Sequence, residues 1–183
     1  MSKRWSTDIK KWTSISQETA NLYLELAEKR LDESVDTSKN ITSRNNLLLM
    51  LCVTLLSGLS GYLASVASED LLTKLLPLAA FTAIVLVVPA LAILAYNALP
   101  FKVGTKGEEP KCIVRSGFID TDYDKHEQFV NLALQMCETY QFKLDENLKV
   151  NTKRQSRLSI ASYLMMSLPL SFLSSWIVVS LTP

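Results

Sequence analysis

Residues that could bind a metal ion are sparse in this 183-residue chain. The sequence has one histidine, His126, which lies in the charged stretch YDKHEQF without a cysteine or a second histidine at ligand spacing. We therefore expect His126 on a solvated helix surface rather than in a metal site. Asp120, Asp122 and Asp124 alternate as at the start of a calcium loop, but the glycine and the distal glutamate of that motif are absent. The sequence predicts no metal and no cofactor.

Nucleophilic and phosphate-binding chemistry also lack a supporting pattern. Cys52, Cys112 and Cys137 have no paired spacing, so we expect reduced thiols without a disulfide or metal role. The stretch GTK at 104–106 resembles part of a phosphate loop, but the glycine spacing and the preceding strand are missing. No serine or cysteine has a plausible local base partner. We expect that the chain is not an enzyme.

Hydroxyl side chains inside apolar stretches are the remaining polar feature, and they could line a path through a membrane. One set consists of Ser57 and Ser60, together with Thr54, in the apolar run 47–66. A second set shares one helical face in the run 158–181 and comprises Ser167, Ser171 and Ser174. Either set could line a pore of little ion selectivity, because neither includes a charged ring.

Three apolar runs, 47–66, 75–99 and 158–181, must position these hydroxyl groups. They contain 20, 25 and 24 residues without a charged side chain. A helix rises about 1.5 Å per residue, so each run can cross a hydrocarbon core about 30 Å thick. The joint at 67–74 is short, which predicts an antiparallel transmembrane hairpin over 45–99. The third run predicts a third transmembrane helix over 158–183.

The first apolar run also carries a face of small residues. Thr54, Gly58, Gly61 and Ser65 repeat at steps of four and three. In lipid, close backbone approach and hydrogen bonds bring helices together, because no hydrophobic force does so. This face predicts a helix contact, either with a neighbouring span or with another copy of the chain.

Amphipathic segments precede the hairpin and follow it. Ser14 and Gln17 have capping-box spacing at the start of the first segment. Its narrow apolar seam favours a partner helix and comprises Ala20, Leu24, Ala27, Leu31 and Val35. The second segment, over 120–157, has a corresponding predicted face, which comprises Phe129, Leu132, Met136, Tyr140 and Leu144, joined by Ala133 and Leu148.

The predicted fold is an all-α membrane protein. A cytoplasmic amphipathic helix within 1–44 leads to the hairpin, and a linker and second long cytoplasmic helix within 100–157 continue into the third transmembrane helix. Lysine and arginine number eight in 1–44 and ten in 101–157, but only Lys74 lies in the joint. Positive-inside logic therefore places the N-terminus and 100–157 in the cytoplasm and the C-terminus outside. The net charge of +1 gives no indication of nucleic-acid binding.

This order of elements resembles the SLATT family, the SMODS- and SLOG-associated two-transmembrane effector domains. The resemblance covers about residues 14–157 and rests on the hairpin and its flanks, NLYLELAEKRLDESVDTSKNITSRNN before it and HEQFVNLALQMCETYQFKLDENLKVNTKR after it. The third apolar run departs from a two-span plan. The resemblance implies an effector of bacterial anti-phage defence in the inner membrane, which oligomerises when a separate sensor or nucleotide signal triggers it. It implies no catalytic residues.

Two functions are compatible with this pattern. The first is a homo-oligomeric effector that forms a pore or otherwise permeabilises or depolarises the membrane. The spans lack the buried charges that transporters and proton relays use, so the expected partners are lipid, further copies and an activating protein. The second is a non-conducting anchor that docks a soluble partner through its cytoplasmic helices.

Overall fold

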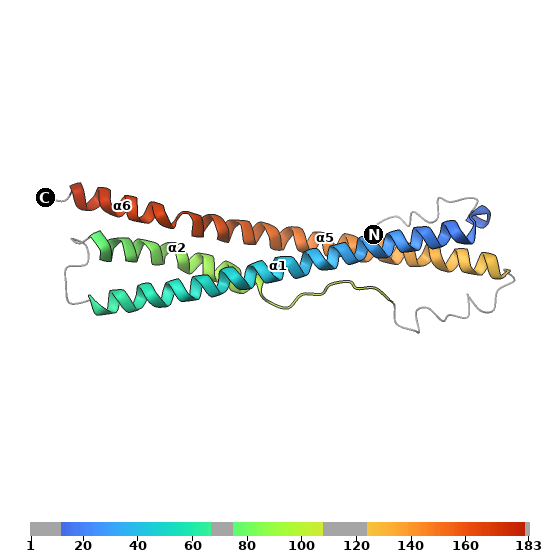
Figure 1. Cartoon of the computed structure of the whole chain (residues 1–183), viewed down its shortest axis with the longest axis horizontal. Coiled ribbons are helices and arrows are strands. Elements are labelled where there is room, and N and C mark those ends of the chain that lie inside the picture. The colour runs from blue at the N-terminus through green and yellow to red at the C-terminus, as the bar shows by residue number, and fades with distance from the viewer. Residues whose placement is uncertain (1–11, 67–74, 108–123, 182–183) are drawn as a thin grey trace. The chain divides into compact units, whose positions relative to one another are not determined.

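The computed structural model of the chain describes residues 12–66, 75–107 and 124–181 (Figure 1). These residues form helices and connecting segments, and they include no strand. The helices are η2 (Trp12–Ser14), α1 (Gln17–Ser65), α2 (Leu75–Asn97), α5 (Lys125–Met166) and α6 (Leu168–Leu181). Within the described ranges, three helical stretches are long and apolar enough to cross a membrane: Gln17–Ser65, Leu75–Asn97 and Lys125–Leu181. The prediction of an all-helical fold is confirmed, and the length and composition of these three stretches suggest a membrane protein.

Some predictions concern residues outside the described ranges. These are the conformation of the joint at 67–74, the state of Cys112, and the alternating carboxylates Asp120 and Asp122. Residues 1–11 also lie outside them.

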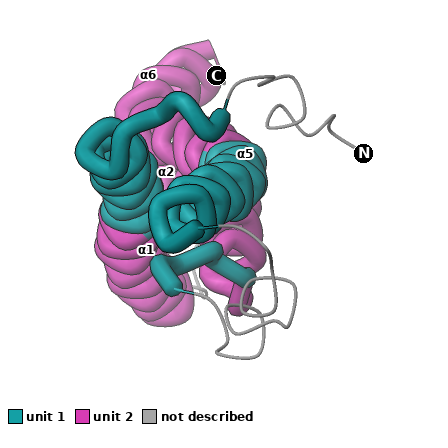
Figure 2. Tube along the Cα trace, turned by 90° about the vertical axis from the view of Figure 1, so that its right-hand side faces the viewer, with its two compact units in different colours: residues 1–38, 102–151 teal, residues 39–101, 152–183 magenta. Residues whose placement is uncertain are grey.

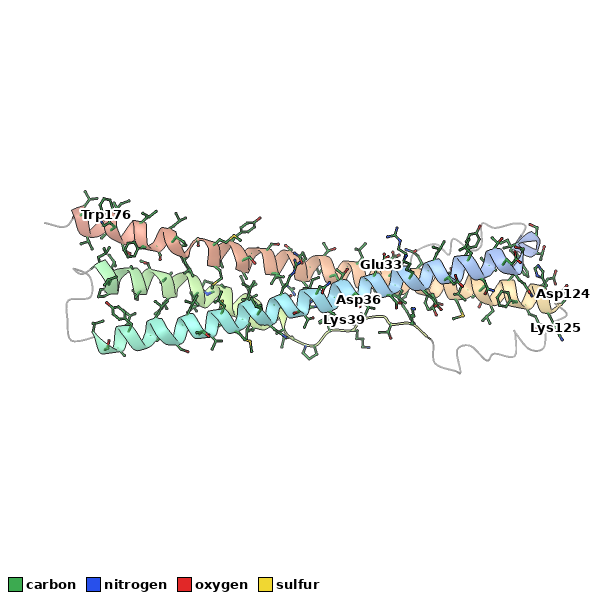
Figure 3. All side chains as sticks on the ribbon, in the orientation of Figure 1. Glu33, Asp36, Lys39, Asp124, Lys125 and Trp176 are labelled. Atoms are coloured by element: carbon green, nitrogen blue, oxygen red, sulfur yellow. The ribbon has the colours of Figure 1, made fainter. Side chains whose placement is uncertain are left out.

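Side-chain caps fix where two long helices begin. The amide of Thr19 donates to Ser16 Oγ at 3.2 Å, which makes Ser16 the N-cap of α1. The prediction of Ser14 as this cap is wrong, because Trp12–Ser14 forms a 3-10 turn of its own. At α5, the amide of Glu127 donates to Asp124 Oδ1 at 2.7 Å. Asp124 therefore caps a helix that begins at Lys125, and Figure 3 shows the two residues at this end of α5.

The chain divides into two compact units, coloured separately in Figure 2. Unit 1 comprises residues 1–38 and 102–151, and unit 2 comprises residues 39–101 and 152–183. Helices α1 and α5 each contribute residues to both units. The predicted boundaries at 44 and 157 lie near these divisions.

Unit 1 is built on a small apolar cluster between α1 and α5. Its buried members are Ala20, Val130, Ala133 and Leu134, with Trp12, Ile15 and Phe129 packed against them. The two helices run parallel within this unit, because the contacts advance together along both: Tyr140 Oη donates to Glu28 at 3.3 Å, and Asn147 Nδ2 donates to Ser34 Oγ at 2.9 Å.

The buried face of α5 matches the predicted one in part. Ala133 and Tyr140 are buried as predicted. Phe129, Leu132 and Met136 are only half-buried, whereas Val130 and Cys137, which were not predicted, are buried. The 3.6-residue period was thus predictable, but the buried face is centred to one side of the larger apolar residues.

Unit 2 contains the apolar core, which α1, α2 and α5 share. Its buried members are Ile41, Cys52, Val87, Ala90, Leu94, Leu158 and Ala161. Helix α2 returns alongside the C-terminal part of α1 (Figure 1). Cys52 Sγ lies 3.3 Å from Met165 Sδ, so this thiol packs against a thioether rather than facing a reactive group.

The third apolar run is interrupted at Ser167, between α5 and α6. Pro169 has no amide proton, and its ring conflicts with the carbonyl four residues earlier, which explains a break here. Beyond it, α6 packs against α2, where Thr82 Oγ1 lies 3.2 Å from Ser175 Oγ. Trp176 lies toward the C-terminal end of α6 (Figure 3), as an aromatic belt would place it.

Candidate functional site: a buried polar cluster in unit 2

A pair of asparagines lies buried beside the apolar core of unit 2. Asn45 is 0% exposed and Asn97 is 2% exposed. Asn97 Nδ2 donates to Asn45 Oδ1 at 3.0 Å, and Asn45 Nδ2 donates to the carbonyl oxygen of Leu94 at 3.1 Å. The pair joins α1 to the last turns of α2. Such a contact fixes helix register, because a shifted helix would leave buried amides without partners.

An arginine extends this cluster to α5. Arg154 is 3% exposed, and its Nη2 donates to Thr42 Oγ1 at 3.0 Å. The guanidinium carbon lies 3.7 Å from the centre of the Phe101 ring, a cation–π contact. The backbone carbonyl of Arg154 accepts from Asn97 Nδ2 at 3.3 Å. Burial lowers the pKa of the Arg154 guanidinium, although an arginine keeps its charge under physiological conditions.

The polar groups of this cluster hold the helices in position. Amides, a hydroxyl and a guanidinium offer no general acid or base near neutral pH. Asn97 Oδ1 is buried and accepts no hydrogen bond from the described residues. The cluster joins α1 and α5 just before the apolar runs that begin at Leu47 and Leu158, and it joins them to α2 near the end of the run 75–99.

A second polar contact in unit 1 holds the segment after α2. The side-chain amide of Asn147 pairs with both backbone groups of Gly104, at 2.8 Å to its amide and 2.9 Å to its carbonyl oxygen. Lys143 Nζ donates to the carbonyl oxygens of Thr105 and Gly107, at 3.1 and 2.6 Å. Lys106 forms ion pairs with Glu28 and Asp32. Residues 102–107, predicted as part of a linker, are therefore docked on the helices of unit 1.

The predicted small-residue face of α1 is exposed. Thr54, Gly58, Gly61 and Ser65 are all exposed, and a Cβ added at either glycine would have no neighbour within 4 Å. Ser57 and Ser60, predicted as pore-lining residues, are exposed as well. No other described segment of the chain covers the two glycines.

The second predicted pore-lining set lies in different surroundings. Ser171 is buried, and its carbonyl oxygen lies 3.4 Å from Thr82 Oγ1 of α2. Ser167 is half-buried at the break between helices, and Ser174 is exposed with its hydroxyl bonded to the Ser171 carbonyl. This serine face is thus partly engaged in a contact within the chain.

The remaining predicted packing residues lie in unit 1. Leu31 is buried, and Leu24 and Ala27 are half-buried on α1. Tyr140 is buried on α5, where burial raises the pKa of its hydroxyl.

His126 is half-buried on the first turn of α5. The described residues include no group of three histidine, cysteine or carboxylate side chains placed to hold a metal ion.

Hydrophobic periodicity alone missed the polar members of these contacts. Asn147, Asn151 and Arg154 continue the steps of three and four that begin at Cys137 and Tyr140. Asn45 continues the α1 seam in the same way. Polar residues at such seam positions are a known device for fixing register. A search for unbroken heptad spacing, with polarity ignored, would have found them.

Comparison of the chain with family models, curated proteins and solved structures gives no match.

Proposed function

We propose that this protein is a homo-oligomeric effector of the bacterial inner membrane that permeabilises or depolarises the membrane when a separate sensor triggers it. The proposal includes no catalysis and places unit 1 in the cytoplasm and the C-terminus outside. The resemblance of the helical order to the SLATT effectors supports the role in anti-phage defence. The structure supports the oligomer, through one observation on α1.

That observation is the exposed small-residue face. Gly58 and Gly61 leave open space at their Cβ positions, and Thr54 and Ser65 flank them on the same exposed face. In a bilayer, such a face allows another helix to approach closely. Since no described part of the chain fills it, the partner we propose is a second copy.

The hydroxyl groups on this part of α1 are compatible with two environments. Thr54 Oγ1 donates to the Met50 carbonyl at 3.0 Å, and Ser57 Oγ donates to the Val53 carbonyl at 2.9 Å. These intrahelical bonds satisfy the donors when the face contacts lipid. The oxygen lone pairs stay available to water or to a neighbouring helix. We therefore assign the pore lining to Thr54, Ser57 and Ser60 rather than to the partly engaged serines of α5 and α6.

Cysteine cross-linking in isolated membranes tests the oligomer. In a cysteine-free background, Gly58→Cys should give a disulfide-linked dimer on mild oxidation. Leu173→Cys on α6 is the matched control, because Leu173 is also an exposed residue of an apolar run. Equal cross-linking at both positions would indicate random collision and would contradict the assignment of the contact to α1.

A membrane-potential dye tests the function. Induced expression, with and without phage infection, should dissipate the potential in cells that carry the wild-type chain. Gly58→Leu should restore the potential, because a bulky residue separates the helices. Ala95→Leu, at an exposed position of α2, should leave the loss of potential unchanged. A stable potential under every condition would exclude permeabilisation.

A non-conducting anchor remains the second candidate, and one observation favours it. Leu22 and Leu26 of unit 1 are each 52% exposed, and Phe142 and Leu148 on α5 are each 62% exposed. Exposed apolar side chains outside the apolar runs favour a protein partner. Capture of a defined soluble partner by wild type but not by Leu22→Glu, with the potential unaffected, would support the anchor.

A further inference from the structure

A groove between α1 and α5 in unit 2 is lined by both hydrogen-bonding and apolar side chains. Its volume is about 420 Å³. Its residues fall into a polar set, Ser43, Arg44, Gln155, Ser159, Ser162 and Tyr163, and an apolar set, Leu47, Leu48, Leu158 and Met166. A cleft of this size is within the range of small-molecule sites.

The polar set is suited to an anion. It contains a guanidinium, an amide and hydroxyl groups, and no carboxylate is among the lining residues. Ser162 Oγ is engaged with the Leu158 carbonyl. In contrast, the side chains of Arg44, Gln155 and Ser159 make no hydrogen bond, ion pair or ring contact with other described residues. A charged donor with neutral donors beside it matches the oxygens of a phosphate group.

The apolar set favours a ligand that has an apolar part as well as an anionic group. Leu47 and Leu158 are the first residues of two apolar runs, so the groove extends along the chain from the polar flank into those runs. Leu48 and Met166 continue its wall in the apolar direction. In a membrane, this places the donors at headgroup depth and the wall beside the acyl chains.

We propose that this groove binds one anionic phospholipid, with its phosphate at Arg44 and an acyl chain along Leu48 and Met166. The lipid would bridge α1 and α5 next to the buried asparagine cluster. The inference depends on the proposed membrane location but not on pore formation.

Native mass spectrometry of the full-length protein tests this inference. The protein is purified in detergent and supplied with equimolar phosphatidylglycerol and phosphatidylcholine. We expect one phosphatidylglycerol retained per chain in preference to phosphatidylcholine. Arg44→Gln should weaken that retention about tenfold, as the loss of one charge-assisted hydrogen bond would. Lys153→Gln is the matched control, because Lys153 is exposed on α5 but does not line the groove.

A second pair of variants tests the groove rather than the charge. Ser159→Trp should fill the groove and abolish retention, whereas Ser156→Trp, at an exposed position outside it, should not. Size-exclusion profiles equal to that of wild type establish that the variants fold. Equal retention of both lipids, or equal effects of Arg44→Gln and Lys153→Gln, would overturn the proposal. Competition by glycerol phosphate alone would also overturn it, because the acyl chain would then contribute nothing.

This result is separable from the proposed function, since no ion flux is measured. Specific lipid binding in a protein that never alters the membrane potential would support the groove and contradict the pore. Loss of the membrane potential without a preference for phosphatidylglycerol would support the pore and contradict the groove.

Discussion

The buried asparagine pair allows a quantitative prediction. In Asn97→Leu, the hydrogen bonds to Asn45 Oδ1 and to the Arg154 carbonyl are lost. In Asn45→Leu, the bonds to Asn97 and to the Leu94 carbonyl are lost. Leucine has the same branched side-chain shape as asparagine and is somewhat larger, so we expect the main effect to arise from polar groups rather than from a cavity.

The magnitude follows from the asymmetry of buried hydrogen bonds. Each bond contributes about 1 kcal/mol net, and a buried group left without a partner adds a further penalty of about 1–3 kcal/mol. The Leu94 carbonyl limits this penalty in Asn45→Leu, because it also accepts from the amide of Ala98 at 3.0 Å. We expect each single variant to lower the free energy of unfolding by about 2–3 kcal/mol.

The double variant distinguishes this explanation from simple loss of packing. With both asparagines replaced, neither amide is left stranded by the other, so the loss should be smaller than the sum of the singles by about 1–2 kcal/mol. Titration with SDS in mixed micelles, followed by circular dichroism, measures the free energy of unfolding. Asn46→Leu is the control, because Asn46 is exposed, and it should change this free energy by less than about 0.5 kcal/mol. Additivity of the two singles within about 0.3 kcal/mol would refute the reasoning.

Three further predictions concern unit 1. In Gly104→Ala, the new Cβ would lie 2.8 Å from Lys143 Cβ, so urea unfolding should reveal a loss of about 1–3 kcal/mol. The hydrogen bond with Asp32 raises the pKa of Lys106. The stabilising effect of Lys106, measured against Lys106→Met, should therefore be present below pH 10.5 and decline as the pH rises further. Burial raises the pKa of the Cys137 thiol. Alkylation of Cys137 at pH 8 should therefore be much slower in the folded protein than in urea, by mass spectrometry.

Each of these three predictions has an outcome that would contradict it. Wild-type stability in Gly104→Ala would mean that residues 102–107 are not closely packed on α5. An advantage of lysine at position 106 that is unchanged at pH 11.5 would exclude the ion pair as its source. Equal alkylation rates in buffer and in urea would contradict the burial of Cys137.

The sequence analysis predicted the helical class and the membrane character, because uncharged apolar runs of 20 or more residues are typical of membrane-spanning helices. It also predicted the 3–4 spacing of the α1 seam, where Ala20 and Leu31 are buried. It placed the buried face of α5 on the larger residues and so missed Val130 and Cys137. Hydropathy depends only on residue type, whereas the burial of a residue between two helices also depends on its size and its position on the helix.

The polar cluster was less accessible to prediction. In the sequence analysis Arg154 was only one of the ten basic residues counted in 101–157, with no indication that it would be buried. Its burial depends on Thr42 and Phe101, which lie far away in the sequence and meet it only in the folded chain. The same applies to Asn45 and Asn97, because neither residue indicates a buried hydrogen bond until the fold brings the two together.

The uncharged character of the three apolar runs has a consequence for how this protein can be controlled. Moving one elementary charge across 100 mV is worth about 2.3 kcal/mol, and voltage sensors use several such charges. Apolar runs without charged side chains would gain almost nothing from the electric field if they tilted or slid within a bilayer. If the protein acts as proposed, its rearrangement should therefore not depend on the membrane potential, and binding of a partner would have to supply the free energy of activation.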